Sequence, residues 1–368
     1  MNILFNDPSK YFVKNKKYLS NILAKVIDSK SYILSDAVRN FENKISKLLS
    51  KKGYFVSCAN GTDALTLAIK CLDIKEGTKI IVPAHTAPAS IMGILRANCI
   101  PYFIDVDLNR PVMTLEIIKK IIKKDKFSAV IAVHLYGYAV DINKIRKFLN
   151  KKNIKLIEDC AQSFGTQIKE KYTGTLADAG CFSFFPTKNL NTLGDGGGVW
   201  VSNKVLMKKL IALRQYGWNS KRTVSIDGGF NSRLDELHAA FLSHRLKTVK
   251  TEIKKRVKIS NIYKIKLSPY YKVFKDQDNT SPAYHLYVVR VKHRKKLISF
   301  MKKNKIFLGI HYFPSAHKNG LLMKYSKDKL PNTDLLAREV VSLPMYPELK
   351  RAEQEYVINK LNEFAENK

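Results

Sequence analysis

The sequence has no long hydrophobic run and little that resembles a targeting segment. Nothing in its 368 residues approaches the roughly 18 consecutive apolar residues of a membrane span. The first twelve residues are short and mixed in character, and Pro8 interrupts them, unlike the apolar stretch of a signal peptide. These absences predict a soluble cytoplasmic protein without a membrane span.

Cysteine is scarce and carries no motif. The five cysteines are odd in number, far apart and never spaced as Cys-X-X-Cys: Cys58, Cys71, Cys99, Cys160 and Cys181. Neither a disulfide scaffold nor a zinc site is indicated by this pattern. We expect buried free thiols in a reducing compartment, and we expect no metal.

Acidic residues are few beside basic ones: 31 Asp+Glu against 65 Lys+Arg give a net charge of +34. Such a charge suits nucleic acid, an anionic membrane surface or acidic small molecules. However, the lysines are spread along the whole chain in short runs that interleave with isoleucine, and no zinc finger or recognition-helix pattern appears. We expect no nucleic-acid partner, and we attribute the charge to solvated helix faces and to attraction of a phosphorylated substrate.

The chain has the length of about two domains, and its 45% hydrophobic content is enough for a sizeable core. Ser35 is expected to cap a helix whose apolar positions from 38 to 49 follow a helical spacing. Beyond residue 55, short apolar strands near 80–82, 102–104, 129–133 and 156–157 alternate with helical stretches. This alternation predicts an α/β fold with a mainly parallel sheet covered by helices.

A second region follows a long helical stretch at 234–249. It has strand-like runs at 286–291 and 306–311 and a closing helix at 351–361. We predict a large domain over residues 1–245 and a smaller C-terminal α+β domain over 246–368.

Ligands of parallel α/β sheets bind outside the carboxyl ends of the strands. That rule selects the polar residues that directly follow the predicted strands: Asn60, His85, His134 and Asp159. These four side chains are the first candidates for a functional site.

Two of these positions lie in segments with a specific chemical use. The segment Asn60-Gly-Thr-Asp63 begins a helix, where a glycine, a hydroxyl and free N–H groups suit a phosphate. The same residues are also typical of an ordinary turn and helix cap.

Asp159 ends a buried strand, where a carboxylate can keep a pyridine nitrogen protonated and make the ring an electron sink. An acidic strand end is equally typical of a helix cap or a metal ligand.

Lys188 stands out among the lysines of the chain. It lies in Cys181-Phe-Ser-Phe-Phe-Pro-Thr-Lys-Asn-Leu190, surrounded by apolar residues and with no acidic neighbour nearby in sequence. Desolvation lowers the pKa of a lysine and favours the neutral amine that forms a Schiff base. Ser183 offers a hydroxyl to an anion, and we interpret the glycine run 194–198 as a turn between strands.

A further glycine pair, Gly228-Gly229, leads into Phe-Asn231-Ser232-Arg-Leu-Asp-Glu-Leu237. Locally, this segment predicts a loop that enters a helix. Asn231 or Ser232 would cap that helix.

Taken together, five ordered blocks resemble the nucleotide-sugar aminotransferases of the DegT/DnrJ type, which are fold-type-I pyridoxal-phosphate enzymes. The resemblance runs from about residue 35 to residue 346. The blocks are Ala-Asn-Gly-Thr-Asp-Ala-Leu from Ala59, Val-Pro-Ala-His-Thr from Val82, Glu-Asp-Cys-Ala-Gln from Glu158, Phe-Ser-Phe-Phe-Pro-Thr-Lys-Asn-Leu from Phe182 and Gly-Phe-Asn-Ser-Arg-Leu-Asp-Glu-Leu from Gly229.

The resemblance implies a role for each matching residue. Lys188 would form the Schiff base with pyridoxal 5'-phosphate and shuttle the proton. Asp159 would pair with the pyridine nitrogen, and Gln162 would approach the ring hydroxyl. Gly61, Thr62 and Ser183 would hold the phosphate of the cofactor. Asn231 would reach the phosphate bound by the neighbouring subunit. The enzyme would therefore be a homodimer with shared active sites.

The resemblance also implies the reaction. L-glutamate would give its amino group to the cofactor, which would pass it to a keto-sugar linked to a nucleoside diphosphate, making an amino sugar for a surface polysaccharide or glycan. A dTDP-linked 6-deoxy keto-hexose is the substrate we favour. His311, Tyr312 and His317 match the block that lines the sugar pocket, although lone histidines are often structural.

Two positions depart from the family pattern. Ala87 stands where relatives often have an aromatic residue that stacks on the pyridine ring, so His85 would take that place only if it points inward. Phe164 stands where many relatives have a histidine. Two alternative functions would require a different sequence: a pyridoxamine-phosphate-dependent sugar dehydratase would have histidine in place of Lys188, and a non-catalytic cofactor-sensing protein would lack the lysine or carry a DNA-binding domain.

Overall fold

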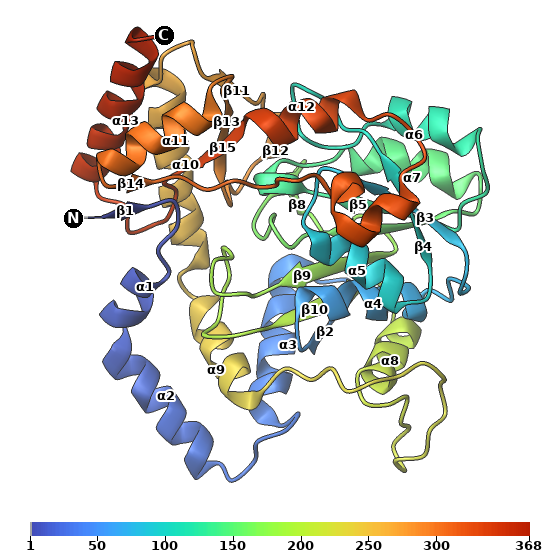
Figure 1. The fold of residues 1–368 in the computed structure, drawn as a ribbon. Coiled ribbons are helices and arrows are strands. Elements are labelled where there is room, and N and C mark those ends of the chain that lie inside the picture. The colour runs from blue at the N-terminus through green and yellow to red at the C-terminus, as the bar shows by residue number, and fades with distance from the viewer. Residues whose placement is uncertain (1) are drawn as a thin grey trace.

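The computed structural model describes residues 2–368 and contains a seven-stranded sheet flanked by helices (Figure 1). The strand order is β2-β10-β9-β6-β5-β3-β4. All neighbours from β9 to β4 run parallel, whereas β10 is antiparallel to both β2 and β9. The predicted mainly parallel sheet is therefore confirmed. Its strands are β2 (Tyr54–Cys58), β3 (Lys79–Pro83), β4 (Ile100–Ile104), β5 (Ala129–Val133), β6 (Lys155–Asp159), β9 (Ala179–Ser183) and β10 (Gly197–Val201).

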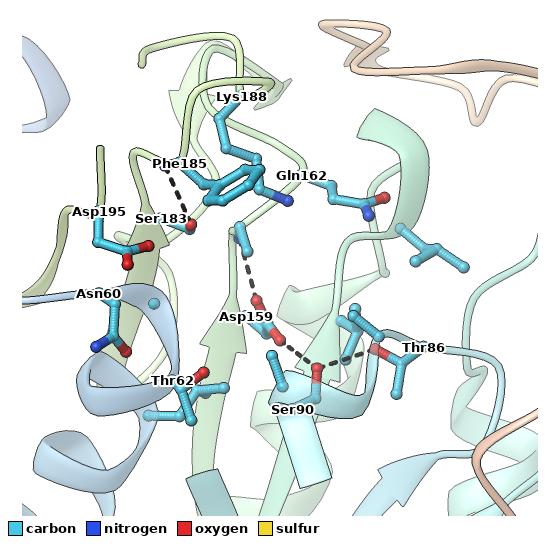
Figure 2. Close-up of a pocket in the computed structure, with 17 residues that line it drawn as sticks. Asn60, Thr62, Thr86, Ser90, Asp159, Gln162, Ser183, Phe185, Lys188 and Asp195 are labelled. Atoms are coloured by element: carbon cyan, nitrogen blue, oxygen red, sulfur yellow. Dashed lines mark hydrogen bonds between the residues drawn. The ribbon is translucent and has the colours of Figure 1, made fainter. Parts of the chain in front are cut away.

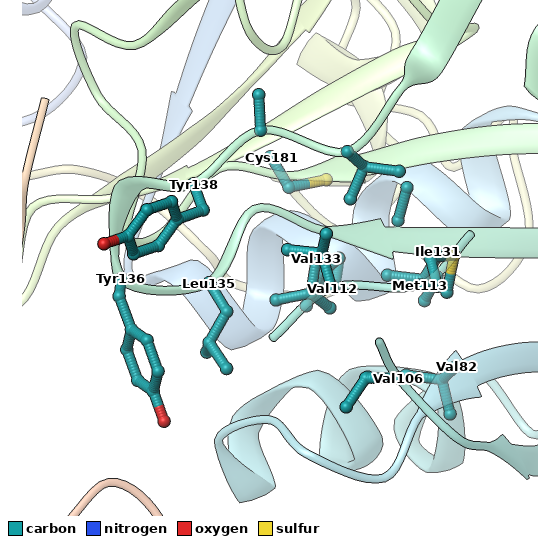
Figure 3. Close-up of a cluster of buried hydrophobic side chains, with 14 of the residues drawn as sticks. Val82, Val106, Val112, Met113, Ile131, Val133, Leu135, Tyr136, Tyr138 and Cys181 are labelled. Atoms are coloured by element: carbon teal, nitrogen blue, oxygen red, sulfur yellow. The ribbon is translucent and has the colours of Figure 1, made fainter. Parts of the chain in front are cut away.

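The central strands are apolar because both faces of the sheet are covered. Every residue of β5 is buried, as expected for a parallel strand between two layers of helices. Successive side chains point to opposite faces, so Val199 and Trp200 of β10 join two different cores. Figure 3 shows part of the larger core, around Val82, Ile131 and Val133. Full burial of each such side chain stabilises the fold by roughly 1.5–3 kcal/mol.

Helices of the first two-thirds of the chain form the two layers that cover the sheet. Helices α1 and α2 form an N-terminal arm (Figure 1). Helices α3 and α9 pack against each other, and α4 packs against β9, β10 and α5. The bounds are α1 (Ser9–Lys14), α2 (Lys16–Asp28), α3 (Asp36–Leu49), α4 (Gly61–Cys71), α5 (Pro88–Arg96), α6 (Leu115–Ile122), the 3-10 turn η1 (Leu135–Gly137), α7 (Ile142–Asn150), α8 (Lys204–Leu213) and α9 (Glu236–Arg245).

Helix α3 begins directly after Ser35, as predicted, but the Ser35 side chain makes no capping hydrogen bond. The buried carboxylate of Glu236 takes that role from a distant part of the chain. It accepts the backbone N–H groups of Ser35 at 2.5 Å, Ala37 at 2.8 Å and Val38 at 3.2 Å. A carboxylate suits this place because the start of a helix has unpaired donors and a partial positive charge.

The C-terminal region is built on a smaller antiparallel sheet, in the order β11-β13-β15. The predicted helix 234–249 is divided into α9 and the start of α10, and the predicted strand 306–311 is limited to β14. The elements of the C-terminal region are α10 (Val249–Lys266), β11 (Lys272–Val273), β13 (Tyr287–Arg290), α11 (Arg294–Lys303), β14 (Ile306–Phe307), η2 (Ala316–Lys318), η3 (Gly320–Tyr325), α12 (Pro331–Glu339), β15 (Val340–Leu343) and α13 (Arg351–Glu366).

Two small sheets tie distant parts of the chain together. Strand β1 (Ile3–Leu4) pairs with β14, so the N-terminal segment joins the C-terminal region. A second small sheet combines β7 (Gln167–Ile168), β8 (Lys171–Tyr172) and β12 (Thr280–Ser281). All five cysteines are buried and free, as expected. None of the helices formed by residues 2–368 is long and apolar enough to cross a membrane.

Candidate active site

A cavity of about 230 Å³ opens at the carboxyl ends of β5, β6 and β9 and at the start of α4 (Figure 2). It brings together six residues that the sequence selected: Gly61, Thr62, Asp159, Gln162, Ser183 and Lys188. Asn60 also lines it, whereas the other two strand-end candidates, His85 and His134, do not. The remaining lining residues are Leu65, Thr86, Ala87, Ala89, Ser90, Val133, Leu135, Ala161, Phe185 and Asp195.

The start of α4 forms one end of the cavity. Asn60 caps the helix, since its side chain accepts the backbone N–H of Asp63 at 2.8 Å. A Cβ atom on Gly61 would lie 2.7 Å from the Cβ of Ser183, so only glycine lets the helix start approach that hydroxyl. A helix N-terminus beside two hydroxyl side chains, Thr62 and Ser183, is a ready site for a phosphate group.

Lys188 extends into the cavity beside Phe185, as Figure 2 shows. Burial lowers the pKa of Lys188 to about 8, and the carboxylate of Asp159 opposes that shift. Desolvation disfavours the charged ammonium form, and the nearby negative charge favours it. The amine is therefore available as a nucleophile near neutral pH.

Asp159 is the last residue of β6, and its carboxylate is 4% exposed. Its Oδ1 accepts the backbone N–H of Ala161 at 3.1 Å, and its Oδ2 accepts the hydroxyl of Ser90 at 2.7 Å. Both contacts suit an ionised carboxylate, because in each one the carboxylate oxygen accepts a hydrogen bond. The remaining lone pairs are free to accept from a ligand in the cavity.

The neighbouring Glu158 points to the opposite face of the strand and serves the fold. Its carboxylate accepts the backbone N–H groups of Gly174, Leu176 and Ala177 at 2.8–3.0 Å, and it contacts Nε2 of His134 at 3.0 Å. Because Nδ1 of His134 accepts a backbone N–H, the proton of this ring lies on Nε2. Both side chains are thereby fully engaged, which explains why His134 does not reach the cavity.

Gln162 is fixed from two sides. Its Oε1 accepts the backbone N–H of Tyr136 at 2.8 Å, and its Nε2 donates to the hydroxyl of Tyr312 at 2.7 Å. The backbone donor settles which end of the amide carries the oxygen. One N–H of Nε2 therefore remains unused and available to a ligand.

The face of the cavity next to Ala87 lacks an aromatic ring from β3 or its loop. His85 does not supply one: its side chain is buried, its Nε2 lies 2.8 Å from the hydroxyl of Tyr136, and burial lowers its pKa to about 3. The aromatic ring that does line the cavity belongs to Phe185, whose side chain is 48% exposed.

None of the three residues predicted for the sugar side lines the cavity. Nδ1 of His311 lies 2.8 Å from Ser342 Oγ, and burial together with the charge of Lys188 lowers the pKa of His311 to about 4. Tyr312 contacts Gln162. His317 is buried and pairs with Asp334 at 3.2 Å, which gives it a structural partner.

Asn231 is exposed and does not line the cavity of its own chain. The local prediction that Asn231 or Ser232 caps the following helix is wrong, because α9 begins only at Glu236, after Asp235. Ser232 is buried and donates instead to Asp63 Oδ2 at 2.7 Å. This contact holds the loop against the first turn of α4.

Of the ten other lining residues, four have a hydroxyl, an aromatic ring or a carboxylate that could contact a ligand: Thr86, Ser90, Phe185 and Asp195. Thr86 and Ser90 follow β3 by only a few residues, so the strand-end rule, extended by one helical turn, would have included them. In the sequence, Phe185 is only one of several apolar neighbours of Lys188. Asp195 lies in the glycine run and has no signal of its own.

The chain is similar to known proteins along nearly its whole length. Residues 14–362 match the model of the DegT/DnrJ/EryC1/StrS aminotransferase family. The chain is 36% identical over 364 residues to a dTDP-3-amino-3,6-dideoxy-alpha-D-galactopyranose transaminase of Aneurinibacillus thermoaerophilus, covering 98% of this chain and 99% of the relative. It is 34% identical over 335 residues to a UDP-N-acetyl-3-dehydro-alpha-D-glucosamine 3-aminotransferase of Acidithiobacillus ferrooxidans, covering 89% and 88%.

A solved structure shares the whole fold. The crystal structure of S. venezuelae DesV in complex with a ketimine intermediate superposes with a TM-score of 0.95 at 29% identity, covering 99% of each chain. This chain belongs to the DegT/DnrJ/EryC1/StrS family and is a pyridoxal-phosphate-dependent aminotransferase. The residues present fit that cofactor: Gly61 leaves the space a Cβ would fill, Lys188 supplies a desolvated amine, and Asp159 supplies a held carboxylate.

Proposed function

We propose that this enzyme transfers the amino group of L-glutamate to the keto group of a nucleoside-diphosphate-linked sugar. The proposed acceptor is a dTDP-linked 6-deoxy keto-hexose, and the product is an amino sugar for a surface polysaccharide or glycan. The observation that carries this proposal is the cavity, which is lined by both the desolvated amine of Lys188 and the hydrogen-bonded carboxylate of Asp159. The end-to-end similarity to a transaminase named for a dTDP-linked 3,6-dideoxy sugar supports the choice of acceptor.

The cofactor phosphate is assigned to the start of α4. Gly61 and Thr62 would present backbone N–H groups and a hydroxyl, and Ser183 would add a second hydroxyl from the end of β9. These are neutral donors in a partly positive field, which suits a phosphate dianion. Asp195, exposed on the same wall, adds a negative charge there that a cation from outside this chain would balance.

The proton chemistry is assigned to three side chains. When bound, pyridoxal 5'-phosphate supplies an electron sink for the carbon that loses its proton. The amine of Lys188, with a pKa of about 8, would be the covalent anchor of the cofactor and the group that takes and returns the substrate proton. Asp159 would hold the proton of the ring nitrogen, and the unused N–H of Gln162 would donate to the ring hydroxyl.

The sugar side is assigned to the segment that carries His311, Tyr312 and His317. Its contact with the cofactor side runs from Tyr312 to Gln162. His311 would be neutral at pH 7, since its pKa is lowered to about 4, and so would offer a neutral ring to a sugar hydroxyl. His317 would act by fixing the segment through Asp334.

The enzyme is proposed to act as a homodimer with shared sites. Asn231 is exposed and lies outside the cavity of its own chain, as a residue that serves the neighbouring site would. An apolar groove lies between the N-terminal arm and α9. It extends to Leu193, two residues from Asp195 of the cavity wall. Most of its lining residues are apolar: Phe12, Val13, Leu19, Leu23, Leu193, Leu237 and Phe241.

Five buried free thiols fit a cytoplasmic location.

The test is a transamination assay with glutamate and a panel of dTDP-, UDP- and GDP-linked keto-sugars. Appearance of 2-oxoglutarate together with an amino sugar should be fastest with the dTDP-linked 6-deoxy keto-hexose. The Lys188→Ala variant is the control and should be inactive with every acceptor. Turnover of a UDP- or GDP-linked sugar alone would overturn the proposed acceptor, and turnover by Lys188→Ala would overturn the assignment of the catalytic lysine.

A further inference from the structure

A chain of side-chain hydrogen bonds lies in the cavity wall behind Asp159. Thr86 Oγ1 lies 2.9 Å from Ser90 Oγ, which lies 2.7 Å from Asp159 Oδ2. The three side chains are buried, with exposed fractions of 1%, 2% and 4%. Figure 2 shows the chain as two consecutive dashed lines that end at Asp159.

The direction of each hydrogen bond follows from the protons available. An ionised carboxylate only accepts, so Ser90 must donate its single hydroxyl proton to Oδ2. The oxygen of Ser90 then has only lone pairs left for Thr86, and Thr86 must be the donor in the second bond. The chain thus runs one way, from Thr86 through Ser90 to Asp159.

The setting of Ser90 favours a negative charge on its partner. Ser90 lies in the first turn of α5, where the helix start carries a partial positive charge. Ala161 meanwhile donates its backbone N–H to the other oxygen of Asp159. With one donor on each oxygen, the carboxylate cannot rotate without losing a bond.

We propose that Ser90, supported by Thr86, is a positioning residue for the cofactor. It keeps the carboxylate of Asp159 turned so that its free lone pairs are available to the ring nitrogen. This inference rests on the role of Asp159 in the proposed function. Ser90 would thus tune the strength of the electron sink without contacting the ring nitrogen itself.

The first experiment compares Ser90→Ala and Ser90→Thr in the holoenzyme. Ser90→Ala should slow the single-turnover reaction with glutamate about tenfold, the effect of losing one hydrogen bond to a charged group. Ser90→Thr, which keeps the hydroxyl, should recover most of that rate. As a readout independent of turnover, the pH midpoint of the visible absorbance of the bound cofactor should shift in Ser90→Ala in the same direction as in Asp159→Asn.

A matched control separates this role from a general effect on folding. Ser260 is also a fully buried serine, but it lies in α10 and does not line the cavity. Ser260→Ala should leave the absorbance midpoint and the glutamate rate unchanged. If Ser260→Ala moves the absorbance midpoint as Ser90→Ala does, the effect is not specific to Asp159 and the proposal fails.

The decisive measurement is a double-mutant cycle with Asp159→Asn. If Ser90 acts through the carboxylate, Ser90→Ala should cost less than about threefold once Asp159 is already asparagine. A full tenfold loss in that background, or an unchanged absorbance midpoint in the single variant, would overturn the proposal. An unchanged rate in Asp159→Asn alone would instead remove the assigned role of Asp159, so the two failures can be told apart.

Discussion

The amide of Gln162 donates to the hydroxyl of Tyr312 across 2.7 Å, although the two residues lie 150 positions apart in the chain. Gln162 lines the cavity, whereas Tyr312 belongs to the C-terminal region. The backbone N–H of Tyr136 holds the oxygen of the same amide. One hydroxyl group of the C-terminal region therefore determines where the free N–H of Gln162 can point.

Tyr312→Phe tests this relationship. Loss of the hydroxyl leaves a buried amide N–H without its acceptor, so Gln162 should turn away from the ring hydroxyl that we assign to it. The visible absorbance of the bound cofactor should shift, and kcat should fall about tenfold. Tyr102→Phe is a suitable control, because Tyr102 is buried and its hydroxyl donates to Asp328 at 2.9 Å without lining the cavity. An unshifted absorbance in Tyr312→Phe would show that Gln162 is held in place without it.

The pH dependence of cofactor loading follows from the lowered pKa of Lys188. Only the neutral amine attacks the aldehyde, and the amine is neutral above its pKa of about 8. The rate at which apoenzyme recovers its visible absorbance with added pyridoxal 5'-phosphate should therefore rise with pH and level off above about 8. Asp159→Asn should move this midpoint to lower pH, because the carboxylate raises the pKa of Lys188. A midpoint near 10.5 in the native enzyme would mean that the amine is not desolvated.

The net charge of +34 should act on substrate capture more than on the bound complex. Attraction of a nucleoside diphosphate is a long-range effect, screened within about 10 Å at 0.1 M salt. Raising the salt concentration should therefore raise KM for the sugar nucleotide and leave kcat nearly constant. A neutral osmolyte at equal osmolality is the control. A KM that is independent of salt would show that the charge serves another purpose.

The sheet was predictable because its signal is local. The strands around Ile81 and Ile131 are built on continuous apolar runs, and a strand buried on both faces needs that composition. The rule that ligands meet the carboxyl ends of such strands then led to Asp159. The apolar surroundings of Lys188 singled it out locally, and similarity to the family blocks then implied the roles of Lys188, Ser183 and the rest of the cofactor set.

Contacts between distant side chains were not predictable. Helix α3 is capped by Glu236, some 200 residues away, and the nearby Ser35 is left unused. Ser90 reaches Asp159 only because β3 and β6 lie on either side of β5. A single sequence does not specify such pairings, since many residues of the same type fit the same local pattern.

The position of Asn231 predicts that each active site needs two chains. Its side chain is exposed beside the loop that Ser232 ties to Asp63, and it does not line the cavity of its own chain. An amide N–H₂ suits a phosphate oxygen, whereas a carboxylate at the same place would repel it. Asn231→Asp should therefore be nearly inactive, like Lys188→Ala, and both variants should keep the fold.

Mixing the two inactive variants tests whether the site is shared. In a heterodimer, one site combines an intact Lys188 with the partner subunit's Asn231, also intact. Random exchange of equal amounts should restore about a quarter of the native activity, because half of the dimers are mixed and each has one complete site. If Asn231 instead serves its own chain, both sites stay defective and no activity returns. Subunit exchange must be verified with differently tagged chains, so that an absence of recovery counts against the shared site.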